Sequence, residues 1–159
     1  MKASLAVLAT TLGVVLACSG LPWRERCGAR APSLASIEPW LPLHAQLRFG
    51  AGERSTSAVV FARREGEAVV LVSLAGFGAR LHTIRIAADR VEIDRTSLGR
   101  LGPPPGWVLD ALGRAFFDPG ALRPAVGVPV TVDSPDCGTT ARVVLLPSGT
   151  SPSDGGETP

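Results

Sequence analysis

The chain has 159 residues, of which 45% are hydrophobic, and its 16 basic and 14 acidic side chains give a formal net charge of +2. A charge this small argues against the broad basic surface by which proteins bind nucleic acid, so we expect no nucleic-acid partner. The length and hydrophobic content fit one folded domain with a sizeable core.

The first 17 residues predict an export signal. Lys2 is followed by the uncharged stretch ASLAVLATTLGVVLA (3–17). A basic start followed by about 15 apolar residues is typical of a secretory signal peptide. A transmembrane helix needs about 20 residues, so this stretch is short for one. Small residues at 17–20 end the stretch, as at a processing site.

The end of this signal resembles the lipobox of bacterial lipoproteins. Its residues are Val15-Leu16-Ala17-Cys18. The resemblance implies cleavage before Cys18, which then carries the lipid, and two or more acyl chains anchor a protein stably. Because Ser19 rather than an aspartate follows, the resemblance favours a lipid-anchored protein on the periplasmic face of the outer membrane. The alternative is a plain signal peptide that is cut near Ala17.

Two further cysteines, Cys27 and Cys137, remain in the exported part. An even number of cysteines in an exported chain suggests a disulfide. Closing a loop of about 100 residues is worth up to about 4.7 kcal/mol in the chain-entropy model. Two unpaired thiols are the alternative.

The composition divides the chain into four parts. Residues 1–17 are the lipoprotein signal peptide, and residues 18–42 are a lipidated tether and N-terminal arm rich in proline and glycine. Residues 43–147 form the β domain. Residues 148–159, SGTSPSDGGETP, contain little that can be buried, so we expect a disordered tail.

Strand patterns dominate the first part of the β domain. LHAQLRF (43–49) alternates apolar and polar residues, which is typical of a half-buried strand. Further strands are predicted at 55–64, 68–75, 80–87 and 90–96, joined by short turns. The stretch 68–75 is apolar at successive positions, which predicts a central strand that is covered on both faces.

The pattern changes after GPPPG (102–106). Residues 107–118 carry apolar side chains at helical spacing: Val108, Ala111, Leu112, Ala115 and Phe116. Two shorter strands are predicted at 128–132 and 141–146. The predicted fold class is mainly β (α+β), a curved antiparallel sheet or incomplete β-barrel with a helical lid.

No catalytic motif stands out, and we expect neither an enzyme nor a metal or other cofactor. His82 shares a strand face with Ile84 and Ile86, which indicates a hydrogen-bonded histidine in a core or cavity. Phe77 lies between glycines at a predicted hairpin tip. It is a candidate for membrane contact, and the alternative is that it folds back onto the sheet edge.

The stretch SLAGFGARLHTIRI (73–86) resembles LolB-like outer-membrane lipoproteins and related lipoproteins of unknown function. The pattern is carried by Leu74, Gly76, Leu81, Ile84 and Ile86. WVLDALGRAFFDP (107–119) is similar to the helix that follows the sheet in those proteins. The resemblance implies a LolA/LolB-like fold, an incomplete barrel whose apolar cavity holds the acyl chains of lipoproteins or lipids.

Two functions follow from these observations. The first is a membrane-anchored lipoprotein that binds a lipid or acyl chain in an apolar cavity between sheet and helix, in lipid or lipoprotein transfer. The candidate lining residues, which pack as an ordinary core if no cavity exists, are Phe49, Phe61, Val70, Val72, Ile84, Ile86, Leu112 and Phe116. The alternative is a structural or accessory lipoprotein of an envelope complex, without a ligand of its own, which predicts an exposed apolar patch of several hundred Å². The sequence names no protein partner.

Overall fold

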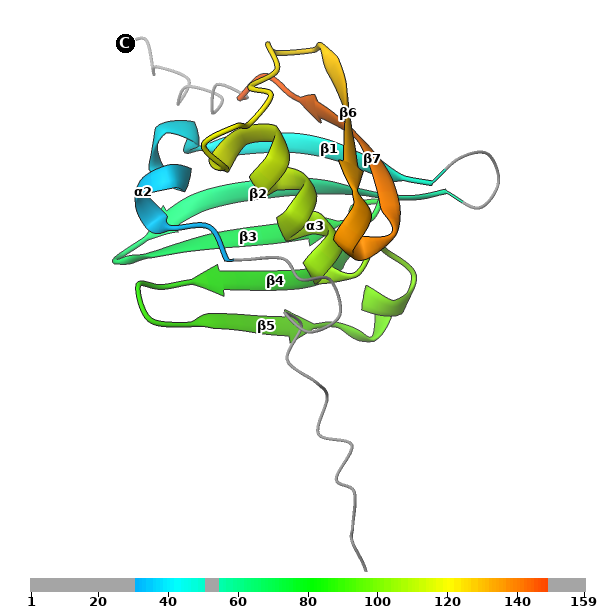
Figure 1. The fold of residues 1–159 in the computed structure, drawn as a ribbon. Helices are drawn as coiled ribbons and strands as arrows, with labels where there is room; N and C mark the ends of the chain where they lie inside the picture. Colours follow the sequence, from blue (N-terminus) through cyan, green and yellow to red (C-terminus); the bar gives the residue numbers. More distant parts are fainter. Residues whose placement is uncertain (1–30, 51–54, 149–159) are drawn as a thin grey trace, which may run out of the picture.

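The computed structural model of the protein describes residues 31–50 and 55–148 (Figure 1). These residues form one open, curved, seven-stranded antiparallel sheet with the order β5-β4-β3-β2-β1-β7-β6. The fold class expected from the sequence is therefore confirmed. The strands are β1 Leu43–Phe49, β2 Thr56–Glu65, β3 Ala68–Leu74, β4 Arg80–Ile86, β5 Val91–Arg95, β6 Pro129–Ser134 and β7 Thr139–Leu145.

The alternation predicted for the first strand is confirmed. Leu43, Ala45, Leu47 and Phe49 of β1 are all at most 2% exposed. β1 pairs with β2 at one edge and with β7 at its other edge, so the C-terminal hairpin β6–β7 extends the sheet beside the first strand. We call the face that carries these buried β1 side chains the inner face, and the opposite face the outer face.

A helical segment lies across the inner face (Figure 1). The α-helix α3 spans Pro105–Leu112 and continues as the π-helix η4, Gly113–Phe117. Proline suits the first turn of a helix because the N–H that it lacks would have no helical partner there. The predicted apolar stripe of this segment is buried throughout: Val108, Ala111, Leu112, Ala115 and Phe116. The segment holds the core against the sheet, as the predicted lid would.

The N-terminal arm joins the folded domain earlier than the sequence indicated. A short helix α2, Leu34–Ile37, leads into the 3-10 turn η1, Glu38–Trp40. Ile37 is fully buried, and the ring of Trp40 lies 5.0 Å from that of Phe116. The expected boundary at residue 42 is therefore too late. A four-residue helix is too short to show helical periodicity, so the pattern of the sequence could not reveal it.

The pairing of β3 with β4 contains an irregularity at Ser73/Leu74. As a result, two successive residues, Leu81 and His82, are both fully buried. The 3-10 turn η3, Ser97–Arg100, packs close to Leu81. A Cβ atom added at Gly99 would lie 2.7 Å from the carbonyl oxygen of Leu81, and one added at Gly102 would overlap Leu81 Cδ1. Gly99 therefore lets the chain approach the backbone of Leu81, whereas a side chain at position 102 would have to displace the Leu81 side chain.

Candidate functional site

The space between sheet and helix, where a lipid cavity was expected, is filled by side chains. Five of the eight candidate lining residues belong to the hydrophobic core and are at most 1% exposed: Phe49, Ile84, Ile86, Leu112 and Phe116. A cavity wide enough for an acyl chain would leave accessible surface on the side chains that line it. These five residues therefore form part of a packed core, which was the alternative to a lipid cavity.

The other three candidates, Phe61, Val70 and Val72, lie on the outer face. The register pairs Phe61 with Val72, and Val70 lies between Arg63 and Arg85. They cannot share a cavity with the core residues because side chains at alternate positions of a strand point to opposite faces of the sheet. The eight candidates therefore do not line one space.

On the outer face the central strands β2 and β3 carry neighbouring apolar side chains, which we name the outer-face patch. Its members are Val59, Phe61, Val70, Val72 and Leu74. Phe61 is 40% exposed, whereas Val70 is only 5% exposed. The helices α2 and α3 and the π-helix η4 pack on the inner face, so no helix of the described residues covers this patch. The prediction that β3 is covered on both faces is confirmed for its inner side chains and, on the outer face, for Ala68 and Val70, whereas Val72 and Leu74 are more accessible.

A hollow of about 500 Å³ opens at one end of the patch and is lined by Pro42, His44, Phe61, Val72 and Ser148, among others. The imidazole of His44 stacks on the ring of Phe61, with 4.2 Å between the ring centroids and 20° between the ring planes. The wall of the hollow is mostly apolar, and the volume of the hollow is within the range of small-molecule sites. This hollow lies on the opposite side of the sheet from the cavity that the sequence predicted.

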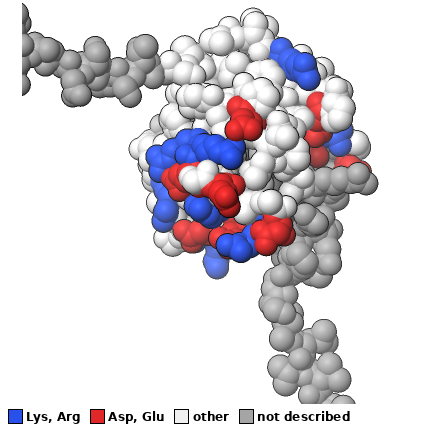
Figure 2. Space-filling model, turned by 90° about the vertical axis from the view of Figure 1, so that its left-hand side faces the viewer, with Lys and Arg blue, Asp and Glu red and all other residues white. Residues whose placement is uncertain are grey.

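Ion pairs border the patch. Arg63 donates to Glu65 at 2.6 Å and Arg85 approaches the same carboxylate at 3.3 Å. The hydrogen bond from Arg63, with the charges of Arg63 and Arg85, holds the pKa of Glu65 below its usual value despite an opposing effect of burial. Figure 2 views the end of the sheet where these strands turn, and acidic and basic side chains are intermixed over its lower part. The mixture of signs gives this rim no strong preference for a charged partner.

His82 lies on the inner face, as predicted, but its imidazole has no hydrogen-bond partner within the described residues. The side chain is fully buried, and so is its cross-strand neighbour Ser73, whose hydroxyl is also unpaired. Burial, with a smaller contribution from the charge of Arg95, lowers the pKa of His82 to about 4. A neutral imidazole beside a serine lacks the third group that orients a catalytic base, so we assign it no catalytic role.

A polar cluster that the sequence did not suggest joins α3 to β6. Asp110 accepts hydrogen bonds from the hydroxyl of Ser134 and from Arg114 Nε, the latter at 3.0 Å. Arg114 also reaches Asp136 at 3.5 Å. Only 8% of the Asp110 side chain is exposed. Each buried polar group here is paired, so the cluster fixes the helix to the C-terminal hairpin rather than offering free groups for chemistry.

The predicted attachment residues lie mostly outside the described part. Cys18 and Cys27 belong to residues 1–30, so the lipid attachment and the predicted pair both remain predictions. Cys137 lies in the 3-10 turn η5, Pro135–Cys137, and its pairing with Cys27 remains a prediction. Phe77 is 74% exposed in the turn between β3 and β4. It therefore projects from the turn instead of folding back onto the sheet edge, and its contact with a membrane remains a prediction.

Among residues 31–50 and 55–148, no group of three or more His, Cys, Asp or Glu side chains is placed to hold a metal ion. The helices of the same residues are all too short or too polar to cross a bilayer.

Comparison with protein families, with characterised proteins and with solved structures found no significant match to this chain. The likeness to LolB-like lipoproteins therefore remains an expectation drawn from residues 73–86 and 107–119.

Proposed function

We propose that the protein is a lipid-anchored accessory protein of a bacterial envelope assembly, and that its outer-face patch binds a protein partner. One observation carries this proposal. β3 supplies apolar side chains to both faces of the sheet, and only the inner set is covered by the chain's own helices. An apolar surface at the centre of a sheet is typical of a contact with another molecule.

The anchor is supported by the sequence. The apolar stretch 3–17 and the lipobox-like residues before Cys18 give the protein a route to the periplasmic face of the outer membrane. The mass of the N-terminal peptide of the protein purified from membranes tests this step. We expect a peptide that starts at Cys18 and carries two or three acyl chains, and a peptide without acyl chains would contradict the anchor.

Binding of a lipid or acyl chain is a second candidate function, now assigned to a different place. The mostly apolar hollow beside Phe61 has a volume of about 500 Å³ and so has room for part of an alkyl chain. In this second function a lipid occupies the surface around Phe61, whereas in the accessory function a protein partner does. Native mass spectrometry of the full chain would show a lipid that leaves on denaturation.

Photo-crosslinking distinguishes the two functions. A photoreactive phenylalanine analogue replaces Phe61, and the matched control places it at Arg142, an exposed position of β7. In cells, we expect a discrete protein adduct from position 61 and none from position 142. A lipid adduct at position 61 would favour the second function. Equal labelling at both positions, or none at either, would contradict a specific role for the patch.

A further inference from the structure

The loop between η4 and β6 exposes apolar side chains for which the proposed function gives no reason. Leu122, Val126 and Val128 are 55%, 57% and 50% exposed. They lie within seven residues of each other, and one arginine, Arg123, stands among them. We name Leu122, Arg123, Val126 and Val128 the loop surface. Exposed apolar side chains and one cation in the same short loop are the composition that suits the boundary between lipid headgroups and acyl chains.

The backbone holds Arg123 in a defined position. Its φ is 50°, in the left-handed region that non-glycine residues rarely adopt. Two hydrogen bonds to η4 support this conformation, from Arg123 N–H to Ala115 O at 2.8 Å and from Leu122 N–H to Arg114 O at 3.1 Å. The Arg123 guanidinium makes no ion pair with any described residue. The backbone at Arg123 is therefore strained, and no acidic side chain of the described residues pairs with its guanidinium.

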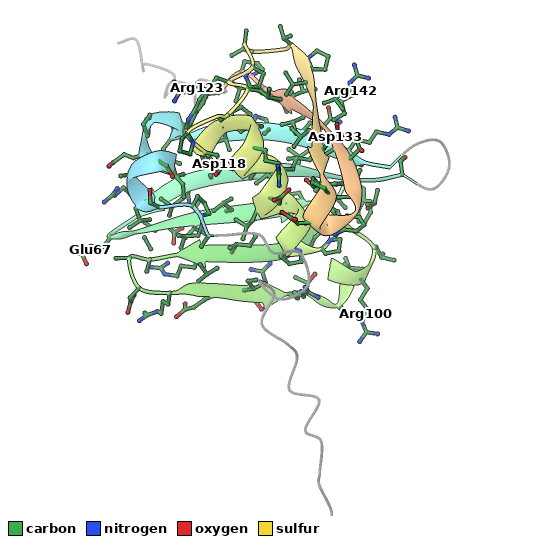
Figure 3. All side chains as sticks on the ribbon, in the orientation of Figure 1. Glu67, Arg100, Asp118, Arg123, Asp133 and Arg142 are labelled. Atoms are coloured by element: carbon green, nitrogen blue, oxygen red, sulfur yellow. The ribbon has the colours of Figure 1, made fainter. Side chains whose placement is uncertain are left out.

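A hollow of about 620 Å³ meets the loop surface at Arg123. Trp40, Phe116 and Phe117 line it, with Asp118 and Arg123 also on its wall. Figure 3 shows Asp118 and Arg123 on the same side of the molecule, with Asp118 at the level of α2 and Arg123 above it. An indole suits the headgroup region of a membrane because it is apolar with one polar N–H, and a guanidinium binds phosphate through paired hydrogen bonds.

The position of this hollow relative to the tether points to its occupant. Ala31, the first described residue, lines the same hollow. Cys18 lies 13 residues earlier in the chain, and a fully extended segment of that length spans at most about 45 Å. A lipid anchor at Cys18 would therefore hold the domain within about 45 Å of the membrane, and the chain would enter the domain beside this hollow. The turn with Phe77 lies at the other end of β3 from the β2–β3 turn, where Glu38 of η1 pairs with Arg64.

We propose that the loop surface and the adjoining hollow form the membrane-contact surface of the protein, with Arg123 binding a phospholipid phosphate and Trp40 lying in the headgroup region. This inference rests on the proposed lipid anchor and deepens it by giving the domain an orientation. The membrane lies at the end that carries α2 and the loop surface, the Phe77 turn points away from it, and the outer-face patch stays accessible to a partner.

Tryptophan quenching tests the orientation. The full chain, with its anchor, is reconstituted into phosphatidylcholine vesicles whose acyl chains carry bromine. One variant keeps only Trp40, through Trp23→Phe and Trp107→Phe. Its matched partner carries Trp40→Phe as well and Phe77→Trp. We expect bromine to quench Trp40 at least twice as strongly as the tryptophan at position 77. Equal quenching, or stronger quenching at position 77, would overturn the proposal.

Charge variants test the part played by Arg123 without relying on the anchor. The chain from Ser19 onward, which lacks both the apolar signal and the anchor, is mixed with vesicles of phosphatidylcholine and phosphatidylglycerol. Removing one cation near such a surface weakens binding about fivefold, so Arg123→Gln should lower the affinity by this factor. Asp118→Asn should raise it similarly, and Phe77→Ser should leave it unchanged. Loss of binding with Phe77→Ser but not with Arg123→Gln would overturn the proposal.

These experiments separate the two ways in which the inference can fail. If the N-terminal peptide carries no acyl chain, the proposed anchor is wrong, whatever the vesicle assay shows. If Cys18 is lipidated but Arg123→Gln and Asp118→Asn leave vesicle binding unchanged, the anchor stands and the assigned surface is wrong.

Discussion

The inner and outer faces of the sheet differ in what covers them, although the same strands build both. On the inner face Leu71 of β3 is fully buried beneath the helical segment, whereas on the outer face Phe61, which pairs with Val72 of β3, is 40% exposed. An apolar strand is therefore compatible with one face that the chain's own helices cover and another face that they leave partly exposed. It does not show that the chain's own elements cover both, and the difference directs attention to a partner at the outer face.

Replacing a phenylalanine on each face measures this difference most directly. Phe116 is 1% exposed and contacts Trp40 and Phe117, so Phe116→Ala should lower the free energy of unfolding by about 3–5 kcal/mol. Phe61→Ala should cost about 1 kcal/mol or less, because much of that ring already meets solvent. Urea unfolding followed by circular dichroism measures both.

The same pair of variants can break the comparison. If Phe61→Ala destabilises the isolated protein as much as Phe116→Ala does, the outer-face patch is covered within the chain itself. The proposal that a separate partner covers it would then lose its main support.

His82 gives the inner face a dependence on pH. Its pKa of about 4 in the folded protein lies below the ordinary value of 6.5, so the unfolded chain takes up the proton first. Stability is therefore unaffected above pH 6.5 and falls as the pH is lowered towards 4, by about 3 kcal/mol in total. Urea unfolding at pH 7, 5.5 and 4.5 should show this loss.

Variants of the two histidines separate the cause from general acid sensitivity. His82→Leu removes the buried imidazole and should flatten the dependence between pH 6.5 and 4. His44→Gln removes a histidine from the outer face and keeps His82, so the dependence should persist. An unchanged slope in His82→Leu would show that other groups cause the acid sensitivity.

A smaller loss of stability is expected from a change at Gly102, in the segment that follows η3 and lies against Leu81. A methyl group at Gly102 would overlap Leu81, which is fully buried, so Gly102→Ala should cost about 1–3 kcal/mol through overpacking. Gly76→Ala is the matched control, because no atom outside its own neighbours lies within 4 Å of the added Cβ. Thermal unfolding of both variants checks the difference. Equal midpoints would mean that the segment after η3 does not pack against Leu81 in this way.

The sequence predicts the order of elements well because hydrophobic periodicity is a local signal. Predicted strand 43–49 coincides with β1, and the stripe of 107–118 is buried along α3 and η4. The pairing of β1 with β7 has no local signal, since it joins residues almost a hundred positions apart. The short helix α2 was not predicted because it is shorter than two helical turns, so its sequence shows no helical periodicity.

Site residues were harder to predict than strands. Alternation shows which residues of one strand share a face. It does not show which face of one strand lies beside which face of the next, or which face the helix covers, and the eight proposed cavity residues come from several strands and a helix. Phe61 and Ile84 were therefore grouped although they lie on opposite faces. Arg123 was missed because its conformation and its lack of an ion pair are properties of the fold. The apolar residues of ALRPAVGV (121–128) were the available signal.

The smallest expected effect concerns the polar rim of the outer face. Arg63 and Arg85 hold the pKa of Glu65 below its usual value of 4.5, so the stabilisation from these pairs is complete above that pH and is lost as the pH falls through the lowered pKa. Carboxyl NMR titration should show the pKa of Glu65 rising in Arg63→Gln, which removes the largest cause, and rising less in Arg85→Gln. Because Arg63 and Glu65 are both solvent-accessible, raising the salt concentration should shrink the shift. A shift that high salt leaves unchanged would mean that the hydrogen bond from Arg63, and not the charges of Arg63 and Arg85, holds the pKa of Glu65 down.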